Sequence, residues 1–269
     1  LEKISIPSSV TQIEDSTFAR CFSLKQVSIS SLITQIGDYA FDQCSSLVQI
    51  PIPFTVTQIG QNAFRGCQSL REVSIPSSVD QIRNFTFEGC SSLEQILIPS
   101  SVTQIGDYAF KGCSSLTMVF IPSSITHIGD FAFSWCSSMT QITIPSFIES
   151  VGSGIFQGCS KLKQIKIEKY KGKEVNLEYI KNKFLMFKSN KALKNYDILL
   201  FTDPNVEKLT IPSFIKIIGD GLLSDCSSLK QITIPSSVTV IGKEAFSRCL
   251  SLTEVSIPFS VTKIGDYAF

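Results

Sequence analysis

The chain has 269 residues and a formal net charge of +1, with 43% hydrophobic and only 17% charged residues. A charge this close to neutral, with no clustered basic face, argues against nucleic-acid binding, and no apolar run is long enough to span a membrane. The apolar content is sufficient to bury a long core.

Nine cysteines divide the chain into units of 23 residues. They lie at 21, 44, 67, 90, 113, 136, 159, 226 and 249, and only the interval from 159 to 226 departs from the period. One unit reads L-x-x-I-x-I-P-S-S-V-T-x-I-G-D-x-A-F-x-x-C-S-S, and its positions are numbered from the opening leucine, so that Leu1, Leu24 and Leu47 are at position 1. A fixed period of this length indicates an array of stacked units.

Each unit is predicted to contain a short strand, a proline stop and a tight turn. Apolar residues alternate at positions 4 and 6, for example Ile96 and Ile98, which is the period of a strand. The proline at position 7 ends the strand because it has no N–H for the ladder. The Ala-Phe pair and the cysteine that follow suit one helical or 3₁₀ turn. Because no unit has enough apolar surface for its own core, successive units must stack, with their strands in a parallel sheet.

The repeated L-x-x-I-x-I-P…I-G-x-x-A-F-x-x-C pattern resembles the treponemal, or BspA-like, subclass of leucine-rich repeats over residues 1–167 and 206–269. Members of this family are surface proteins of bacteria and parasitic protists. The resemblance implies a right-handed solenoid with a parallel β-sheet on the concave side and short 3₁₀ or helical turns and loops on the convex side. It also implies a cell-surface or secreted protein that adheres to host or matrix molecules or binds other proteins.

The chain is divided into regular repeats at 1–167, an irregular lysine-rich island at 168–205 and regular repeats at 206–269. We expect one continuous elongated domain of about eleven coils, because Val206 follows Leu162 by 44 residues, only two short of two periods, and the stack can continue across the island. Within the island, 184–187 and 198–201 have the pattern of buried strands. Neither end shows a polar capping unit, so we expect a fragment of a longer array, with any export signal or anchor outside it and open ends that can associate end to end.

The cysteine column is interpreted as packing inside the stack. Nine is an odd number, every cysteine has the same place in its unit, and disulfide frameworks usually have an even count with varied spacing. Buried free cysteine behaves as a small hydrophobe. Disulfides and metal binding are the alternatives. The distance expected between the Cα atoms of cysteines in adjacent coils is within the range of a disulfide, but their side chains point in parallel directions, which disfavours one.

No catalytic constellation is visible in the sequence, so we expect no enzyme, no cofactor and no metal site. The only histidine, His127, replaces a glutamine that recurs in other units and is interpreted as a surface substitution. Asn84 begins the sole N-glycosylation sequon, but Thr86 takes a slot that faces inward, so modification is not expected. A further repeated column is interpreted as solvated turn residues or caps: Asp38, Asp107, Asp130, Asp220 and Asp266.

Positions 3 and 5 of the strand point away from the core because side chains alternate. These columns are mostly Gln, Ser and Thr, but Leu97, Met118 and Phe120 break the pattern in two neighbouring units. Exposed apolar clusters often mark interaction sites. We therefore predict a partner-binding patch of these three residues with Gln95 and Gln141; the alternative is drift without function.

Two further candidate partner-binding sites lie outside the repeated strand. The only tryptophan, Trp135, replaces a glycine found in other units. It accompanies an aromatic column that either forms a contact stripe or, as we prefer, covers the next coil: Tyr39, Phe85, Tyr108, Phe131 and Tyr267. In the island, Lys188, Lys191 and Lys194 are predicted either to meet an anionic surface such as an acidic glycan or to belong to a solvated spacer.

Three functions are compatible with these features. The first is a non-catalytic module that binds a protein or glycan ligand through the concave sheet. The second is a spacer that associates with copies of itself, and the third is an intracellular scaffold, since thiols stay reduced in the cytosol. No nucleic-acid partner and no membrane span are expected, and the fold does not identify the ligand.

Overall fold

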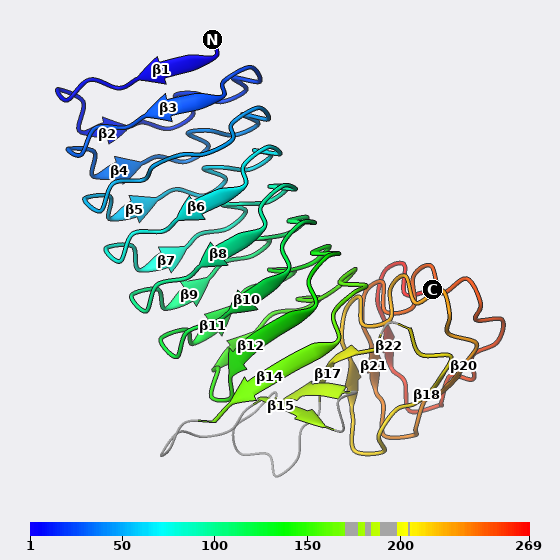
Figure 1. Cartoon of the computed structure of the whole chain (residues 1–269). Coiled ribbons are helices and arrows are strands. Elements are labelled where there is room, and N and C mark those ends of the chain that lie inside the picture. Colours follow the sequence, from blue (N-terminus) through cyan, green and yellow to red (C-terminus); the bar gives the residue numbers. More distant parts are fainter. Residues whose placement is uncertain (170–176, 181–183, 189–197, 204) are drawn as a thin grey trace.

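The protein is described by a computed structural model that covers residues 1–169, 177–180, 184–188, 198–203 and 205–269. The chain winds into flat coils of about one 23-residue unit each, and the coils stack into a column that runs from the N-terminus to a bend near the island (Figure 1). The predicted leucine-rich-repeat solenoid is confirmed.

The first ladder of strands carries positions 3 to 5 of successive coils, and we call its outward side the strand face. Pairing is parallel and in register: Met118 is opposite Gln95 and Gln141, 23 residues away on either side. The middle residue of most strands is buried and its two neighbours are exposed, as predicted. The strands are β1 (Lys3–Ser5), β3 (Gln26–Ser28), β6 (Glu72–Ser74), β8 (Gln95–Leu97), β10 (Met118–Phe120), β12 (Gln141–Pro145) and β14 (Gln164–Glu168).

A second parallel ladder, absent from the sequence prediction, follows the proline turn of each coil. Its strands are mostly two residues long, which is too short for an alternating pattern to be visible in a sequence. They are β2 (Gln12–Ile13), β4 (Gln35–Ile36), β5 (Gln58–Ile59), β7 (Gln81–Ile82), β9 (Gln104–Ile105), β11 (His127–Ile128) and β13 (Ser150–Val151).

The predicted helical or 3₁₀ turn is wrong: no helix of either kind occurs in the described residues. Two consecutive β-turns take its place, closed by hydrogen bonds from Lys111 N to Tyr108 O and from Cys113 N to Phe110 O, both 3.1 Å. Position 16 (Tyr108, φ 56°) and position 20 (Gly112, φ 73°) are left-handed in this coil and in its neighbours. A left-handed residue at each end leaves no run of right-handed residues long enough for a helix.

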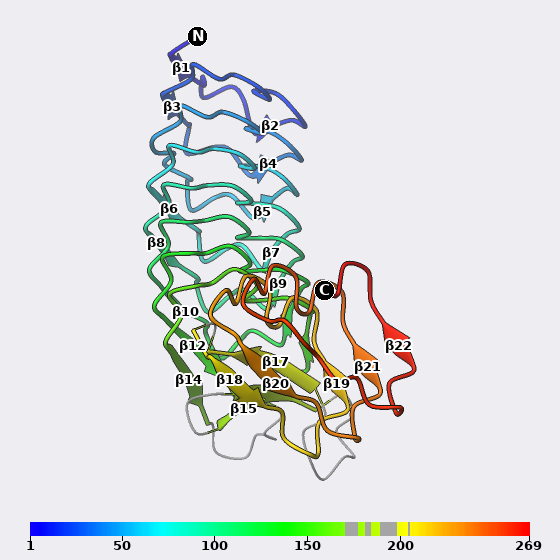
Figure 2. The same cartoon turned by 90° about the vertical axis from the view of Figure 1, so that its right-hand side faces the viewer.

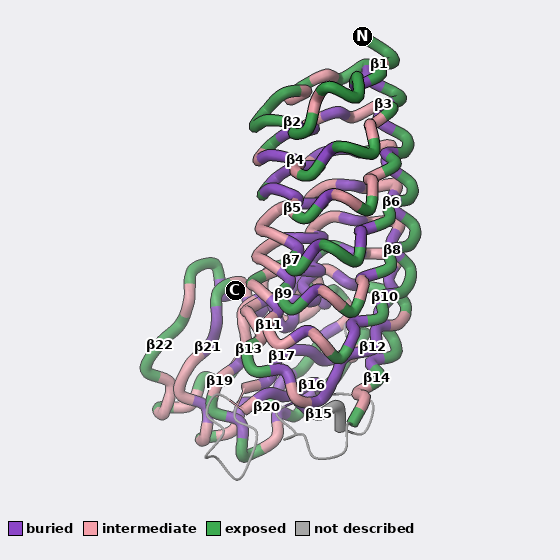
Figure 3. Tube along the Cα trace, turned by 90° about the vertical axis from the view of Figure 1, so that its left-hand side faces the viewer, coloured by how far each residue is buried: buried purple, intermediate pink, exposed green. Residues whose placement is uncertain are grey.

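The core is a set of columns that run through the stack. Buried phenylalanine rings at position 18 stack with centroids 5.3–5.6 Å apart, from Phe41 to Phe133. The leucine, isoleucine and cysteine columns lie beside them and are almost entirely inaccessible to solvent. Figure 3 shows this as a buried interior behind an exposed or half-exposed rim in every coil.

The island replaces regular pairing with antiparallel strands. β15 (Leu177–Ile180) pairs with β16 (Phe184–Phe187), and β16 pairs with β17 (Ile198–Thr202), both antiparallel. The strands predicted at 184–187 and 198–201 are therefore confirmed. β17 then pairs parallel with β19 (Ile217–Ile218), followed by β21 (Val240–Ile241) and β22 (Lys263–Ile264).

The expectation that the stack continues across the island in irregular form stays a prediction, but the strand-face ladder does not run through the island as one sheet. The strand face ends at β14, and β18 (Lys208–Thr210) with β20 (Gln231–Thr233) forms a separate sheet. The C-terminal coils lie beside the N-terminal column, on the side of its turns (Figures 1 and 2). At this place β16 lies between two cores, with Leu185 and Phe187 in one and Met186 in the other. The boundaries at 167/168 and 205/206, and the single domain, stay a prediction.

Candidate functional surfaces

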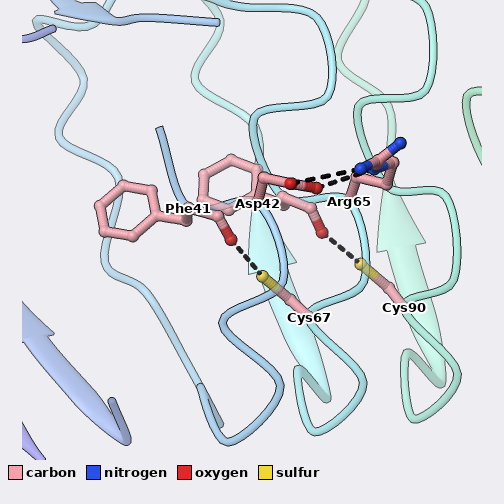
Figure 4. A network of polar contacts seen from close by, with 6 residues as sticks. Phe41, Asp42, Arg65, Cys67 and Cys90 are labelled. Atoms are coloured by element: carbon pink, nitrogen blue, oxygen red, sulfur yellow. Dashed lines mark hydrogen bonds and ion pairs between the residues drawn. The ribbon is translucent and has the colours of Figure 1, made fainter. Parts of the chain in front are cut away.

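The cysteine thiols have a regular structural place in the stack. All nine cysteines are free. Most of them donate a hydrogen bond to the carbonyl oxygen of the position-18 residue in the preceding coil. The distance is 3.2 Å both from Cys67 Sγ to Phe41 O and from Cys90 Sγ to Phe64 O (Figure 4). Burial raises the pKa of the Cys159 thiol to about 12. A neutral, buried, hydrogen-bonded thiol is suited to packing and not to nucleophilic attack, which requires the thiolate.

The aspartate column also joins neighbouring coils. Asp107 Oδ1 accepts a hydrogen bond of 2.8 Å from the backbone amide of Asp130, and Asp130 Oδ1 accepts one of 2.7 Å from Ser153. Asp107 is half-buried and Asp130 is exposed, as expected of solvated turn residues, and both side chains also accept hydrogen bonds between coils. Asn84 occupies the same position, and its Oδ1 accepts from the amide of Asp107 at 2.9 Å, so the sequon side chain is already engaged within the stack.

Sequence reasoning missed a ladder of alternating charge at position 19. Asp42 accepts hydrogen bonds from Arg65 at 2.7 and 3.3 Å, and Glu88 lies 3.3 Å from Lys111 (Figure 4 for the first pair). The side chain of Asp42 is only 7% exposed. The alternating signs, −, +, −, +, are visible in a column of the repeat alignment and could have identified the pairs.

The predicted partner-binding residues lie together on the strand face. Leu97 is 74% exposed, Met118 56% and Phe120 48%, on the adjacent strands β8 and β10. Gln95 and Gln141 flank Met118 in register, Gln95 exposed and Gln141 half-buried. The arrangement is a flat apolar patch with amide groups on both sides, able to bind a partner without any chemistry of its own.

A hollow borders this patch on the side of the N-terminus. Pro51 stands at position 5 of the third coil, where its missing N–H leaves only two isolated bridges, from Gln49 to Gln26 and to Glu72. Beside it is an open hollow of about 430 Å³ that reaches from Pro51 and Glu72 to Leu97. A ligand on the patch therefore has both an apolar ridge and an adjoining depression with a carboxylate.

Most rings of the aromatic column pack against rings of the neighbouring coils. Phe85, Tyr108 and Phe131 stack with centroids 4.8 and 5.2 Å apart and are half-buried. The preferred interpretation, that these rings cover the next coil, holds for these three. Tyr267, in contrast, is 78% exposed.

The secondary candidates are far from the strand-face patch. Trp135 is 37% exposed and lies at the bend, where its ring covers Gly158. Lys188 is half-buried after β16, whereas Lys191 and Lys194 lie outside the described residues. The structure therefore brings Leu97, Met118, Phe120, Gln95 and Gln141 together and leaves Trp135 and Lys188 apart from them.

The only histidine and the acidic residues form no metal-binding group in the described part of the chain. His127 lies in β11, paired with Gln104 and Ser150, and its Nδ1 is 2.7 Å from Thr126 Oγ1. Over the described ranges, no three His, Cys, Asp or Glu side chains are grouped closely enough to hold a metal ion. The same residues include no helix with the length and hydropathy of a membrane span.

Comparisons with known proteins agree with this architecture. The profile described as "BspA type Leucine rich repeat region (6 copies)" matches residues 1–117, 80–198 and 182–269. No curated protein matches the chain at a significant level.

Solved structures give the same result. A leucine rich cell surface protein from Faecalibacterium prausnitzii is similar, with 28% identity, a TM-score of 0.81 and coverage of 100% of this chain and 79% of that one. The pneumococcal vaccine antigen PcpA shares the fold at 20% identity, with a TM-score of 0.61 and coverage of 98% and 68%. Together, the 23-residue coils and the profile match over the whole sequence place this chain in the BspA-type leucine-rich-repeat family.

Proposed function

We propose that the chain is a non-catalytic binding module of a cell-surface or secreted protein and that it attaches to a protein or glycan of a host or matrix through the strand face. The observation that carries the proposal is the cluster of Leu97, Met118 and Phe120, three apolar side chains that are each about half exposed or more on two adjacent strands. Solvent-exposed apolar clusters of this kind favour contact with a partner. The rigid sheet supports this role because little conformational entropy is lost when a preorganised surface binds.

The surface location is part of the same proposal. It is supported by the family and by the name of the Faecalibacterium prausnitzii relative, a cell surface protein. Labelling of intact cells with a reagent that does not cross membranes tests it: the protein should be labelled without lysis. Labelling only after lysis would favour an intracellular scaffold instead.

Binding to immobilised host cells and matrix proteins tests the strand face. The double variant Met118→Gln, Phe120→Asp should lose at least about tenfold in affinity, equivalent to about 1.4 kcal/mol, with an unchanged unfolding midpoint because both side chains are exposed. Ser28→Asp is the matched control, since it adds a charge at position 5 of a distant strand on the same face. If both variants bind as the unchanged protein does, the patch is not the contact surface.

Light scattering over a concentration series separates this function from a self-associating spacer. A binding module should keep a constant molecular mass, whereas a spacer that associates end to end should grow with concentration.

The lysine-rich island is predicted to be a second contact, for an acidic glycan. Charge reversal at Lys188, Lys191 and Lys194 should weaken binding to heparin if these lysines meet an anionic partner. Undiminished heparin binding by the reversed variant would leave the island as a spacer.

A further inference from the structure

Two turns that are far apart in sequence occupy consecutive places in the stack. Gln157 Nε2 donates hydrogen bonds to Ser224 Oγ at 3.4 Å and to Glu244 Oε2 at 2.8 Å, although Ser224 is 67 residues away. Gly221 permits this approach, because a Cβ there would lie 2.8 Å from Gln157 Cγ. The turn at 154–160 therefore faces the turn at 221–227 across the bend.

The backbone ladder between turns is interrupted at this place. Elsewhere, amides at positions 16, 18 and 20 donate to the carbonyls of positions 15, 17 and 19 in the next coil, as from Phe131 N to Ser153 O at 2.8 Å and from Phe133 N to Ile155 O at 3.1 Å. At the bend, three amides and three carbonyls have no hydrogen-bond partner in the described part of the chain. The amides belong to Gly154, Phe156 and Gly158, and the carbonyls to Asp220, Leu222 and Ser224.

A cavity of about 200 Å³ lies beside the contact between the two turns, and its lining includes Phe156 and Gly158 from the amide row and all three residues of the carbonyl row. Phe156 and Phe201, whose rings meet edge to face at 5.8 Å, form its apolar part. Trp135 lines it too, with its ring over Gly158 and with 37% of its surface exposed. Because buried backbone groups without a partner are costly, the cavity is suited to a ligand that pairs with them.

The polar groups that line the cavity indicate which class of ligand it can bind. A purely apolar molecule would leave both rows unpaired, and a cation could not pair with the amides. An anion would meet the carbonyl row and the carboxylates of Asp220 and Asp225, which also line the cavity. A polyhydroxylated ring fits both rows because each hydroxyl donates and accepts, and its C–H face can pack on an aromatic ring.

We propose that the cavity at the bend binds one neutral sugar ring of the hexose type, such as the terminal residue of a glycan. The hydroxyls accept from the amides of Phe156 and Gly158 and donate to the opposite carbonyls, and Trp135 contacts the ring at the mouth. A cavity of about 200 Å³ limits the ligand to a small molecule and is too small for a peptide segment several residues long. This site is separate from the strand face and does not depend on it.

The single tryptophan of the sequence is a built-in reporter. Fluorescence of the whole protein is titrated with glucose, galactose, mannose and N-acetylglucosamine, and with glucuronate and dialanine as an anionic sugar and a peptide. At least one neutral sugar should give a saturable change with a Kd on the order of 1 mM or tighter. The proposal is overturned if no neutral sugar saturates, or if glucuronate or dialanine binds as tightly as the best of them.

Two variants locate the sugar. Ser160 lines the cavity at position 22, where the first coil carries an exposed Phe22, so Ser160→Phe should fold normally and raise the Kd at least about tenfold. Ser114→Phe makes the same change away from the cavity and should bind as the unchanged protein does. Trp135→Gly restores the glycine of neighbouring coils and should also weaken binding, measured by saturation-transfer NMR. Unchanged affinity in Ser160→Phe would place the sugar elsewhere and overturn the site.

Discussion

The thiol of Cys113 donates a hydrogen bond of 3.2 Å to the carbonyl oxygen of Phe87 in the preceding coil. Both residues are fully buried, so no solvent competes for the carbonyl. This contact repeats along the stack and gives the cysteine column a role that apolar packing alone does not: the thiol is a second donor to a buried carbonyl that already accepts from the amide of Cys90.

Replacement of Cys113 by alanine should therefore destabilise the protein by about 1–3 kcal/mol, because the buried carbonyl keeps its bond from Cys90 N but loses its second donor, and a small cavity remains. Urea unfolding measures the loss. Cys21→Ala is the matched control, since Cys21 has the same place in its coil but is only partly buried; its effect should be smaller. Equal losses in the two variants would mean that the hydrogen bond contributes nothing.

The thiols should also make stability fall at alkaline pH. Burial raises the pKa of Cys44 to about 12 and that of Cys113 well above its usual value near 9.0. In the unfolded chain, thiols ionise from about pH 9 upward while the buried ones stay neutral, so their contribution is complete below pH 9 and is lost as the pH rises toward the folded-state pKa. Each buried thiol should cost about 1.4 kcal/mol per pH unit in that window.

Tyrosine and lysine side chains ordinarily titrate in the same pH range. The informative quantity is therefore the difference in unfolding free energy between the unchanged protein and a variant that lacks one thiol. The free energy of unfolding of Cys113→Ala should fall less steeply between pH 9 and 11 than that of the unchanged protein, by about 1.4 kcal/mol per unit. Parallel curves over that range would show that Cys113 does not stay neutral in the folded state.

Much of the fold could be predicted because the sequence repeats one 23-residue unit many times. Columns of leucine, isoleucine, phenylalanine and cysteine identified the core, and alternation placed Leu97, Met118 and Phe120 on the exposed face, as observed. Whether that face binds a partner is a property of a second molecule, and no pattern within this chain decides it.

The parts that could not be predicted depend on backbone conformation or on the absence of a pattern. Position 16 is left-handed even where it is Tyr108 or Phe131, residues that rarely signal that conformation. The recurrent glycine at position 20, as in Gly89 and Gly112, was a signal that could have argued against a helix. The bend and its cavity arise from the island, where the repeat is lost and with it the means of predicting a register.

The aspartate column gives a test of the contacts between coils. Asp107→Asn should change stability by less than about 0.5 kcal/mol, because asparagine retains the oxygen that accepts from Asp130 and Asn84 already serves in this way one coil earlier. Asp107→Ala leaves the amide of Asp130 without its acceptor and should cost about 1 kcal/mol. Thermal unfolding monitored by circular dichroism gives both values. Similar losses in the two variants would assign the effect to charge and not to the hydrogen bond.

The pair of Asp42 and Arg65 should be the strongest ion pair to test. The hydrogen bond to Asp42 raises the pKa of Arg65, and the 7% exposed carboxylate has little access to water. Arg65→Ala leaves that charge buried without its partner and should cost about 3 kcal/mol. Asp42→Ser should cost less, since serine occurs at position 19 in Ser134 and the freed guanidinium is 36% exposed.

A double-mutant cycle then isolates the pair. Arg65→Ala in the Asp42→Ser background should cost at least about 1 kcal/mol less than in the unchanged protein, because no buried carboxylate remains to be compensated. The exposed pair of Lys230 and Glu207, at 3.0 Å with side chains 59% and 62% exposed, is the reference, and Lys230→Ala should cost about 0.5 kcal/mol or less. If Arg65→Ala costs no more than Lys230→Ala, the charge ladder at position 19 does not stabilise the stack.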